Sequence, residues 1–237
     1  MKIVVAIIGL FAVINVATCY LSPSYRTSDT SMSTSKYMQY LRERSQIERL
    51  RTQMESICPG KDDELDEALT KLKQCSNEVD ENAETACSAI KNHFLRCSKP
   101  FIELFESCLP EESREIPRLV FEAINSGVAY VCKVDGEHIF EFANTCIFKN
   151  NYRSMRCERR VRTKLQQFKN KPPTKTEICE LAQSMKPCLH NHLQESCGNG
   201  ITRESFMGMF DAVTAPCNNR GSNQIEYNTV NEVVEAF

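Results

Sequence analysis

The chain has no tryptophan and only eight glycines among its 237 residues. Because glycine supplies many of the tight turns that join short strands, this shortage argues against a β-sandwich. The sequence also lacks a CxxC pair, a G-x-S-x-G elbow, a P-loop, an HExxH motif and a complete EF-hand loop. It therefore has no recognised signature of a zinc ribbon, a thiol redox centre, a serine hydrolase, a nucleotide-binding protein or a calcium sensor.

The chain has no large excess of either charge, with 29 Lys and Arg residues and 31 Asp and Glu residues. Nucleic-acid-binding domains carry a strong basic surplus. We therefore expect no nucleic-acid partner.

Histidine is scarce as well, with four in the chain. His190 and His192 are two residues apart, which places them about 200° apart on a helix, so they cannot bind one metal ion together. His192 falls near the apolar stripe of its helix, and we expect it to be packed there. The sequence thus predicts no metal, no cofactor and no catalytic residue, and we expect a protein that is not an enzyme.

The first residues have the layout of a secretory signal peptide. Lys2 is followed by an apolar run from Ile3 to Ile14, and then by the small residues Ala17 and Cys19. A transmembrane helix needs about 20 apolar residues, so this run is too short to span a membrane. We expect residues 1–19 to be removed and the mature protein to be secreted with no transmembrane segment. A lipoprotein acylated at Cys19 is the alternative.

The thirteen cysteines become twelve when Cys19 leaves with the signal peptide, and twelve can all pair in an oxidising compartment. Their pairing cannot be chosen from sequence. Cys179 and Cys197 share an azimuth on one helix and Cys188 lies opposite, so we expect that helix to be cross-linked on both sides. The predicted disulfide cysteines are Cys58, Cys75, Cys87, Cys97, Cys108, Cys132, Cys146, Cys157, Cys179, Cys188, Cys197 and Cys217.

The body of the chain is predicted to be all-α, a disulfide-stapled multi-helix bundle. A disordered Ser/Thr-rich arm is expected over 20–35, a helical cysteine-rich domain over 36–217 and a flexible tail over 218–237. Apolar residues recur at helical spacing in the domain. Helices are predicted over 36–57, Leu65–Leu72, Phe101–Cys108, Ile116–Val131 and about 202–215.

Helix ends are marked by residues with known capping roles. Pro59 and Gly60 end the helix over 36–57. Asp135 is a predicted N-cap for a short helix that reaches Phe142. Thr174-x-x-Glu177 is a capping-box pattern that begins a helix closed by Gly198, and Pro187 should bend that helix.

One segment, from Lys149 to Lys171, carries nine basic residues against the single acid Glu158, and apolar residues interrupt it at helical intervals. Two interpretations remain open. A basic amphipathic helix can contact an anionic lipid or glycan surface. Alternatively, the helix face is solvated, and the acidic segment from Asp62 to Glu84 is a candidate for the surface that it faces; the sequence does not decide whether the two segments meet. The residues that would contact an anionic surface are Arg153, Arg156, Arg159, Arg160, Arg162 and Lys164.

Four stretches of the chain are distinctive: "CSKPFIELFESCLP", "VAYVCKVDGEHIFEF", the C-x8-C-x8-C of Cys179, Cys188 and Cys197, and "TAPCN". Together they resemble the insect 27 kDa haemolymph glycoprotein family. The resemblance implies a secreted, mostly helical protein of insect haemolymph, with no established catalytic activity or cofactor. This sequence departs from the family in lacking any N-x-[ST] acceptor for N-linked sugar, and in its Ser/Thr-rich arm and "NEVVEAF" tail.

Three functions compete on these grounds. The preferred one is a non-catalytic haemolymph protein that acts by binding a protein partner, since the acidic and basic segments are separated in the chain. The second is a carrier that holds a small apolar ligand within a cross-linked helical bundle. The third is a protease inhibitor, for which residues 169–175 would be the exposed loop.

Overall fold

The computed structural model describes residues 48, 51–52, 54–55, 58–79, 83–149, 152–168 and 171–218, without the side chains of 152–154. The predicted signal peptide, the Ser/Thr-rich arm and all of the tail beyond residue 218 lie outside these residues. Of the helix expected over 36–57, the described residues 48, 51–52 and 54–55 are helical. Gly60 follows with a positive φ of 74°, as expected for a glycine that ends a helix.

The described part of the chain is all-α, as predicted, and contains no strand. Three short 3-10 helices connect the longer elements: η1 (Glu111–Ser113), η2 (Thr145–Phe148) and η3 (Ala215–Cys217). The α-helices are α3 (Asp62–Asn77), α4 (Ala86–Cys108), α5 (Glu115–Val131), α6 (Gly136–Glu141), α7 (Tyr152–Gln167), α8 (Lys175–Ser196) and α9 (Gly200–Thr214).

The predicted caps are present. Glu177 N–H donates to Thr174 Oγ1 at 3.2 Å, and Thr174 N–H donates to Glu177 Oε2 at 2.7 Å, which completes the capping box of α8. Asp135 Oδ1 accepts from His138 N–H at 3.1 Å at the start of α6. Helix α8 continues through Pro187 to Ser196.

Helix α4 is longer than the eight residues that its apolar spacing predicted. It begins at Ala86, where Thr85 Oγ1 accepts from Ser88 N–H, and it continues through Pro100. Three polar residues, Lys91, Asn92 and His93, stand between Ile90 and Phe94 in its first turns, so the apolar spacing is less evident there even though Ala89 and Phe94 are buried.

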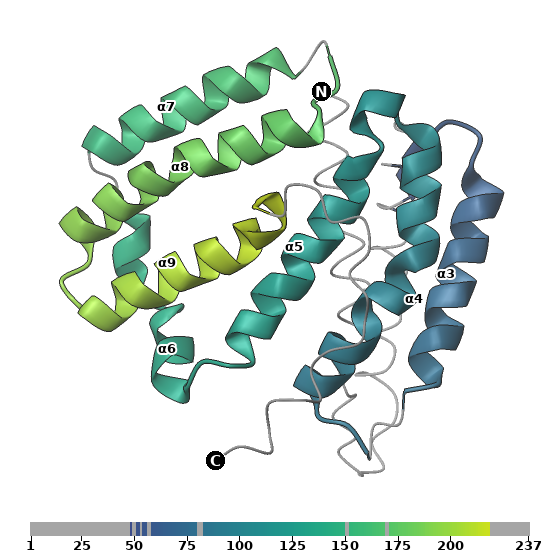
Figure 1. Ribbon diagram of the computed structural model, residues 1–237, viewed down its shortest axis with the longest axis horizontal. Helices are drawn as coiled ribbons and strands as arrows, with labels where there is room; N and C mark the ends of the chain where they lie inside the picture. Colours follow the sequence, from purple (N-terminus) through teal and green to yellow (C-terminus); the bar gives the residue numbers. More distant parts are fainter. Residues whose placement is uncertain are drawn as a thin grey trace.

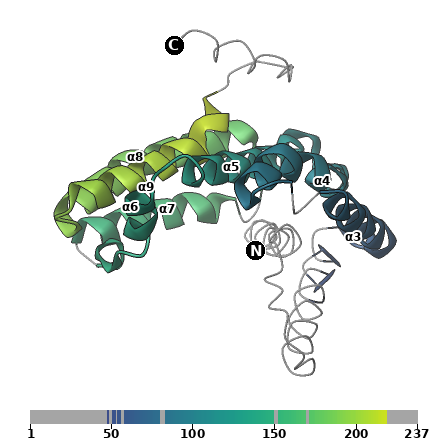
Figure 2. The same ribbon diagram turned by 90° about the horizontal axis from the view of Figure 1, so that it is seen from below.

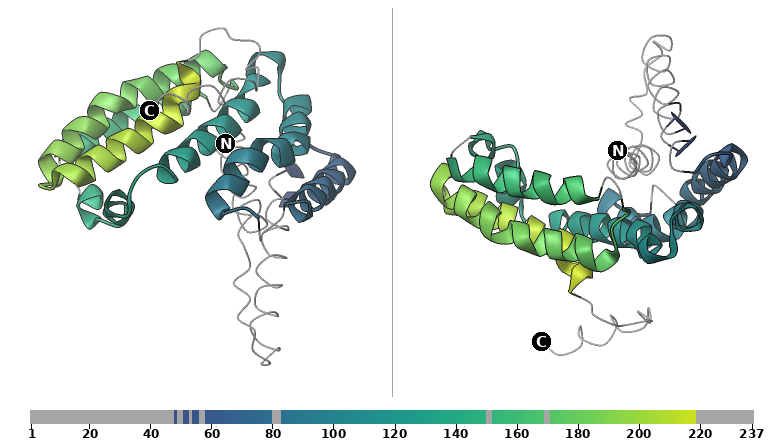
Figure 3. Two further views of the ribbon diagram at one scale, coloured as in Figure 1. Left: turned by 60° about the horizontal axis from the view of Figure 1, so that its bottom comes forward. Right: turned by 90° about the horizontal axis from the view of Figure 1, so that it is seen from above.

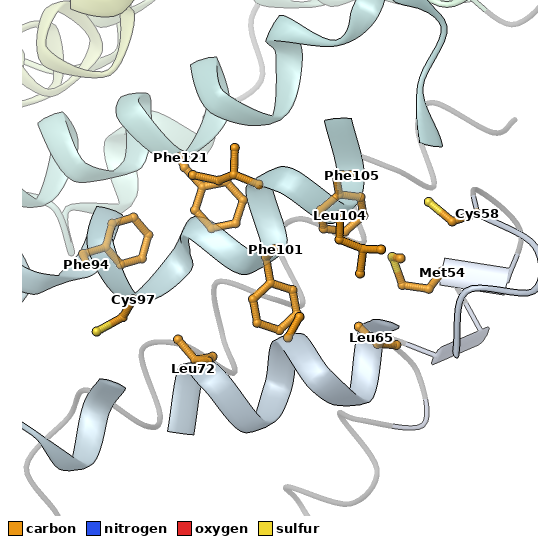
Figure 4. Packing of buried hydrophobic residues seen from close by; sticks show 12 residues of the cluster. Met54, Cys58, Leu65, Leu72, Phe94, Cys97, Phe101, Leu104, Phe105 and Phe121 are labelled. Atoms are coloured by element: carbon orange, nitrogen blue, oxygen red, sulfur yellow. The ribbon is translucent and has the colours of Figure 1, made fainter. Parts of the chain in front are cut away.

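Helices α3, α4 and α5 enclose the larger core. Phe94 and Phe121 stack with ring centroids 5.9 Å apart, and Phe101 lies between α4 and α3, toward Leu72 (Figure 4). The buried residues of this cluster are Met54, Cys58, Leu65, Ala68, Leu72, Phe94, Cys97, Phe101, Ile102, Leu104, Phe105 and Phe121.

A second, smaller core lies where α8 meets η2 and α9. Its buried members are Cys146, Leu193 and Cys197. Phe206 packs against them and meets Phe142 edge to face, with 5.2 Å between ring centroids. Apolar burial is therefore distributed unequally between the two ends of the molecule.

The twelve predicted cysteines form six disulfides, and none of these bonds joins the first six cysteines to the last six. The expectation for α8 is confirmed, because Cys188 bonds to α7 while Cys179 and Cys197 bond to η3 and η2. The pairs are Cys58–Cys108, Cys75–Cys97, Cys87–Cys132, Cys146–Cys197, Cys157–Cys188 and Cys179–Cys217.

This pairing divides the described chain into an amino-terminal unit (residues 58–132) and a carboxy-terminal unit (residues 146–217), each closed by three disulfides. Non-covalent contacts join them, mainly α5 against α9. Gly127 and Gly208 allow the close approach, because a Cβ at Gly208 would collide with the Tyr130 ring and one at Gly127 would lie 2.9 Å from Val213 Cγ2.

The described helices form a curved array. Helix α3 lies at one end, and α6 to α9 lie at the other (Figures 1 and 2). Helix α7 lies on the outer side of α8, which is its main packing partner among the described helices. One long side of α7 is therefore left for other contacts.

Candidate functional site: the outer face of α7

The basic segment forms helix α7, which α8 holds along one side. Cys157 is bonded to Cys188 of α8, and Val161, Leu165 and Phe168 are half-buried. At 100° per residue these four side chains occupy one 80° sector. The helix is thus fixed by an apolar stripe and a disulfide, and its opposite face is turned away from the protein.

The outward side carries Arg156, Arg159 and Arg160, at spacings of three and one. These spacings place the three guanidinium groups within a 100° sector of the helix. All three side chains are exposed, and among the described residues none has an acidic partner. We call this set the arginine face.

The other predicted contact residues are placed differently. Arg162 is exposed but its guanidinium donates to Glu158 Oε1 at 2.6 Å, so the single acid of the segment neutralises it. Lys164 is half-buried. Arg153 lies in the first turn of α7, and its side chain is outside the described residues. Three of the six predicted residues therefore form the face.

The alternative in which this helix faces the segment from Asp62 to Glu84 is wrong. Helix α3, which contains most of those acids, lies at the opposite end of the molecule from α7 (Figures 1 and 3). Three of the five carboxylates of α3 have local partners instead, in the ion pairs Arg51–Asp66, Lys61–Glu64 and Lys71–Glu67 at 2.6–2.8 Å.

The histidines are placed as their spacing predicted. His190 is exposed, whereas His192 is half-buried with its Nε2 2.8 Å from the carbonyl oxygen of Ile147. Among the described residues no group of three His, Cys, Asp or Glu side chains is arranged to hold a metal ion.

The described part of the proposed inhibitor loop (residues 169–175), residues 171–175, is held against the rest of the protein. Residues 169–170 lie outside the described chain. Pro173 is buried and its carbonyl accepts from Ser113 Oγ at 2.6 Å. Lys175 pairs with Glu115 at 3.0 Å. These contacts bind the segment to the start of α5 and leave Lys171 as its exposed basic residue.

Sequence reasoning missed a polar cluster around Glu141. Its carboxylate accepts from the hydroxyl of Thr202, from Asn144 Nδ2 at 3.0 Å and from Asn199 Nδ2 at 3.1 Å. These hydrogen bonds, first of all that from Thr202, hold the pKa of Glu141 below its ordinary value. Asn199 and Thr202 lie 58 and 61 residues from Glu141 in the chain, so no local sequence motif predicts these hydrogen bonds.

Residues 33–218 match the family model described as a protein of unknown function, DUF1397. The chain belongs to this family. No curated protein and no solved structure is significantly similar to it. No helix in the described part of the chain is long and apolar enough to cross a membrane. Secretion into haemolymph, a protein partner, carriage of an apolar ligand and protease inhibition all stay predictions.

Proposed function

We propose that this protein is a secreted, non-catalytic binding protein of haemolymph, and that the arginine face of α7 binds the acidic surface of a protein partner. The observation that supports the proposal most directly is the row Arg156, Arg159 and Arg160, exposed on a fixed helix with no acidic partner among the described residues. Exposed basic residues without an acidic partner, such as Lys91, Arg114 and Lys133, also occur elsewhere in the described chain, but in this row three lie together on one face of a helix.

Arginine suits such a contact because its planar guanidinium matches a carboxylate in two hydrogen bonds. The three side chains project from one helix that the Cys157–Cys188 bond and the half-buried stripe keep in place. A fixed scaffold lowers the entropy lost on binding. No ion pair within the described part of the chain has to break before these three groups meet a partner.

The charge of the whole carboxy-terminal unit favours the same partner. Residues 146–217 contain twelve basic residues against six acids, a net charge of +6, whereas residues 58–132 contain eight against fifteen, a net charge of −7. Opposite charge at the two ends of one molecule orients an acidic protein during its approach. The approach is directed toward α7.

Secretion is supported by the six disulfides, which persist in oxidising compartments and are rare in the cytosol. The apolar leader and the resemblance to haemolymph proteins support the same compartment. A binding role is supported by the arginine face and by the absence of a catalytic motif from the sequence.

The test compares three immobilised proteins in haemolymph: the unchanged protein, the variant R156Q/R159Q/R160Q, and a charge-matched control, K91Q/R114Q/K133Q. The control removes three exposed basic residues from outside α7. We expect the unchanged protein and the control to retain the same stoichiometric partner, identified by mass spectrometry, and to release it in salt. The α7 variant should bind that partner at least about tenfold more weakly.

Equal retention by the α7 variant would remove the arginine face from the contact. Binding to heparin or to anionic vesicles in place of any protein would mean that the face contacts an anionic glycan or lipid surface. If no protein is retained at all, the proposed partner class is wrong.

A further inference from the structure

Large apolar side chains are displayed at one end of the molecule. Among the described residues, the exposed ones are Ile139 (44% exposed), Phe140 (80%), Phe148 (74%), Met155 (56%) and Val213 (40%). Four of these five lie between residues 139 and 155, in α6, in η2 and in the first turns of α7. Isolated exposed apolar residues are ordinary, but here four of the five, two of them phenylalanines, belong to three consecutive elements of the chain.

Phe140 is held in this exposed position by its neighbour. Helix α6 buries no residue of its own, yet Glu141 ties it to α9 through Thr202 and Asn199. Phe142 packs edge to face against Phe206. The residues on the carboxy-terminal side of Phe140 are thus fixed, and Phe140 itself points away from that contact.

Phe148 is also held in an exposed position by the bonds of its neighbours in η2. Cys146 of η2 is bonded to Cys197, and the carbonyl oxygen of Ile147 lies 2.8 Å from His192 Nε2. The anchors of α6 and η2 therefore lie between His192 and Phe206, where α8 ends and α9 begins (Figures 1 and 3). Both phenylalanines belong to this end of the molecule.

The charges beside the two phenylalanines are opposite. On α6, Glu137 is exposed and has no ion-pair or hydrogen-bond partner among the described residues. Beside Phe148, Lys149 is exposed, and Arg156 follows Met155. Helix α6 therefore presents an apolar and acidic surface, whereas η2 and the start of α7 present an apolar and basic one.

We propose that this end of the molecule binds a second copy of the same chain. In a two-fold dimer, α6 of each copy lies against η2 and the start of α7 of the other. Glu137 then faces Lys149 of the second copy, and the phenylalanines are covered. A two-fold interface requires a self-complementary surface, and two adjacent apolar elements of opposite charge supply one. Every contact occurs twice.

The test measures the self-association of the purified mature protein by sedimentation velocity over a dilution series. We expect a concentration-dependent dimer. Phe140→Ser or Phe148→Ser should raise the dissociation constant at least about thirty-fold, since each loss of an aromatic anchor occurs twice in the dimer. Val213→Ser, at the other end of α9, removes apolar surface outside this region and should leave the dimer intact; because Val213 also lies against Gly127 of α5, it is compared only if its melting curve matches that of the unchanged protein. Melting curves check that each variant is folded.

Charge-reversal variants distinguish this specific interface from nonspecific hydrophobic association. Glu137→Lys or Lys149→Glu alone should weaken the dimer, and the double variant should restore it. A protein that stays monomeric up to the highest concentration would overturn the proposal. So would a dimer that both serine variants preserve, or a double charge variant weaker than either single one. These variants leave Arg156, Arg159 and Arg160 unchanged, so the pull-down with R156Q/R159Q/R160Q tests the arginine face separately, although Arg156 lies beside both surfaces.

Discussion

The amino-terminal and carboxy-terminal units each contain three disulfides, but they bury very different amounts of apolar surface. The amino-terminal core cluster has twelve buried residues, four of them phenylalanines. The carboxy-terminal cluster has three, and two of these are the bonded pair Cys146 and Cys197. A buried Leu or Phe side chain contributes about 1.5–3 kcal/mol to stability. We infer that the same number of cross-links matters more where the core is smaller.

The two units also differ in how their buried polar residues are bonded. Each unit buries two: Ser98 and Ser113 in the amino-terminal unit, and Thr202 and Ser205, both in α9, in the carboxy-terminal unit. Ser98 Oγ has no hydrogen-bond partner among the described residues, whereas Thr202 Oγ1 is bonded to Glu141 and Ser205 Oγ donates to the carbonyl of Ile201 at 2.8 Å. Such groups must keep their hydrogen bonds to remain buried without cost. The carboxy-terminal unit therefore depends on specific polar contacts and on covalent bonds to hold α7 and its arginine face.

The largest expected difference appears when one disulfide is removed from each unit. Cys58–Cys108 and Cys146–Cys197 span 50 and 51 residues, so their removal releases the same loop entropy, about 4 kcal/mol in the chain-entropy model. We expect C146A/C197A to abolish amide protection in α8 and α9, because it also removes two of the three buried residues of that cluster. C58A/C108A should be destabilised but keep α4 and α5 protected. Hydrogen exchange followed by mass spectrometry measures both.

Equal loss of protection in the two variants would mean that the units unfold together, with α5 transmitting the damage. If both variants lost amide protection only in α3 and α4, the amino-terminal unit would depend more on its disulfides than the carboxy-terminal unit does. Because the loop lengths match, neither result can be attributed to the denatured state.

A smaller effect is expected at the contact between the units. Gly208→Ala places a methyl group against the Tyr130 ring, and the overpacking should lower the free energy of unfolding by about 1–3 kcal/mol. Gly198→Ala is the control, since a Cβ at that position would have no neighbour within 4 Å. Urea denaturation of both variants gives the comparison. Relief of the Gly208→Ala defect by a second change, Tyr130→Ala, would identify the ring as the obstacle.

If Gly208→Ala were as stable as the unchanged protein, the Tyr130 ring would have room to move, and α5 and α9 would not depend on this close approach. The units would then be joined mainly by their remaining contacts, including the Ser113 hydrogen bond to the carbonyl of Pro173.

Local chemistry made much of this fold predictable. The capping box at Thr174, the N-cap at Asp135 and the apolar rhythm from Ile116 to Val131 each lie within one stretch of chain, and each produces the expected helix. The two-sided cross-linking of α8 followed from 100° per residue alone. Each of these features is decided by neighbours in sequence.

Features that depend on distant residues were not predictable. The separation of the disulfides into two sets requires knowing which helices meet, and the spacing of Cys87 and Cys132 does not reveal it. The basic character of α7 was evident, but the distance from α7 to α3 was not, so the acidic segment was a plausible and incorrect neighbour. The exposure of Phe140 and Phe148 could not be predicted, because apolar residues in a helical pattern are ordinarily buried.

The smallest expected effect is a pH dependence confined to α6, which links the two units. Hydrogen bonding by Thr202 first, then by Asn144, holds the pKa of Glu141 below 4.5, while the hydrogen bond to Asp135 raises the pKa of His138 above 6.5. The Glu141 contribution is present above pH 4.5 and is lost as pH falls through the lowered pKa. The His138 contribution is present below pH 6.5 and is lost as pH rises through the raised pKa.

Both contributions are therefore complete between about pH 4.5 and 6.5. The free energy of unfolding of the unchanged protein, minus that of Glu141→Gln, should shrink as pH falls below this window. The same difference for His138→Gln should shrink as pH rises above it. Glu180→Gln, at an exposed glutamate of α8 outside this polar cluster, is the control. If the Glu141→Gln difference stayed constant down to about pH 3, well below the ordinary pKa of a glutamate, its hydrogen bond to Thr202 would not favour the ionised carboxylate. The carboxy-terminal unit would then depend on its disulfides more than on this polar contact.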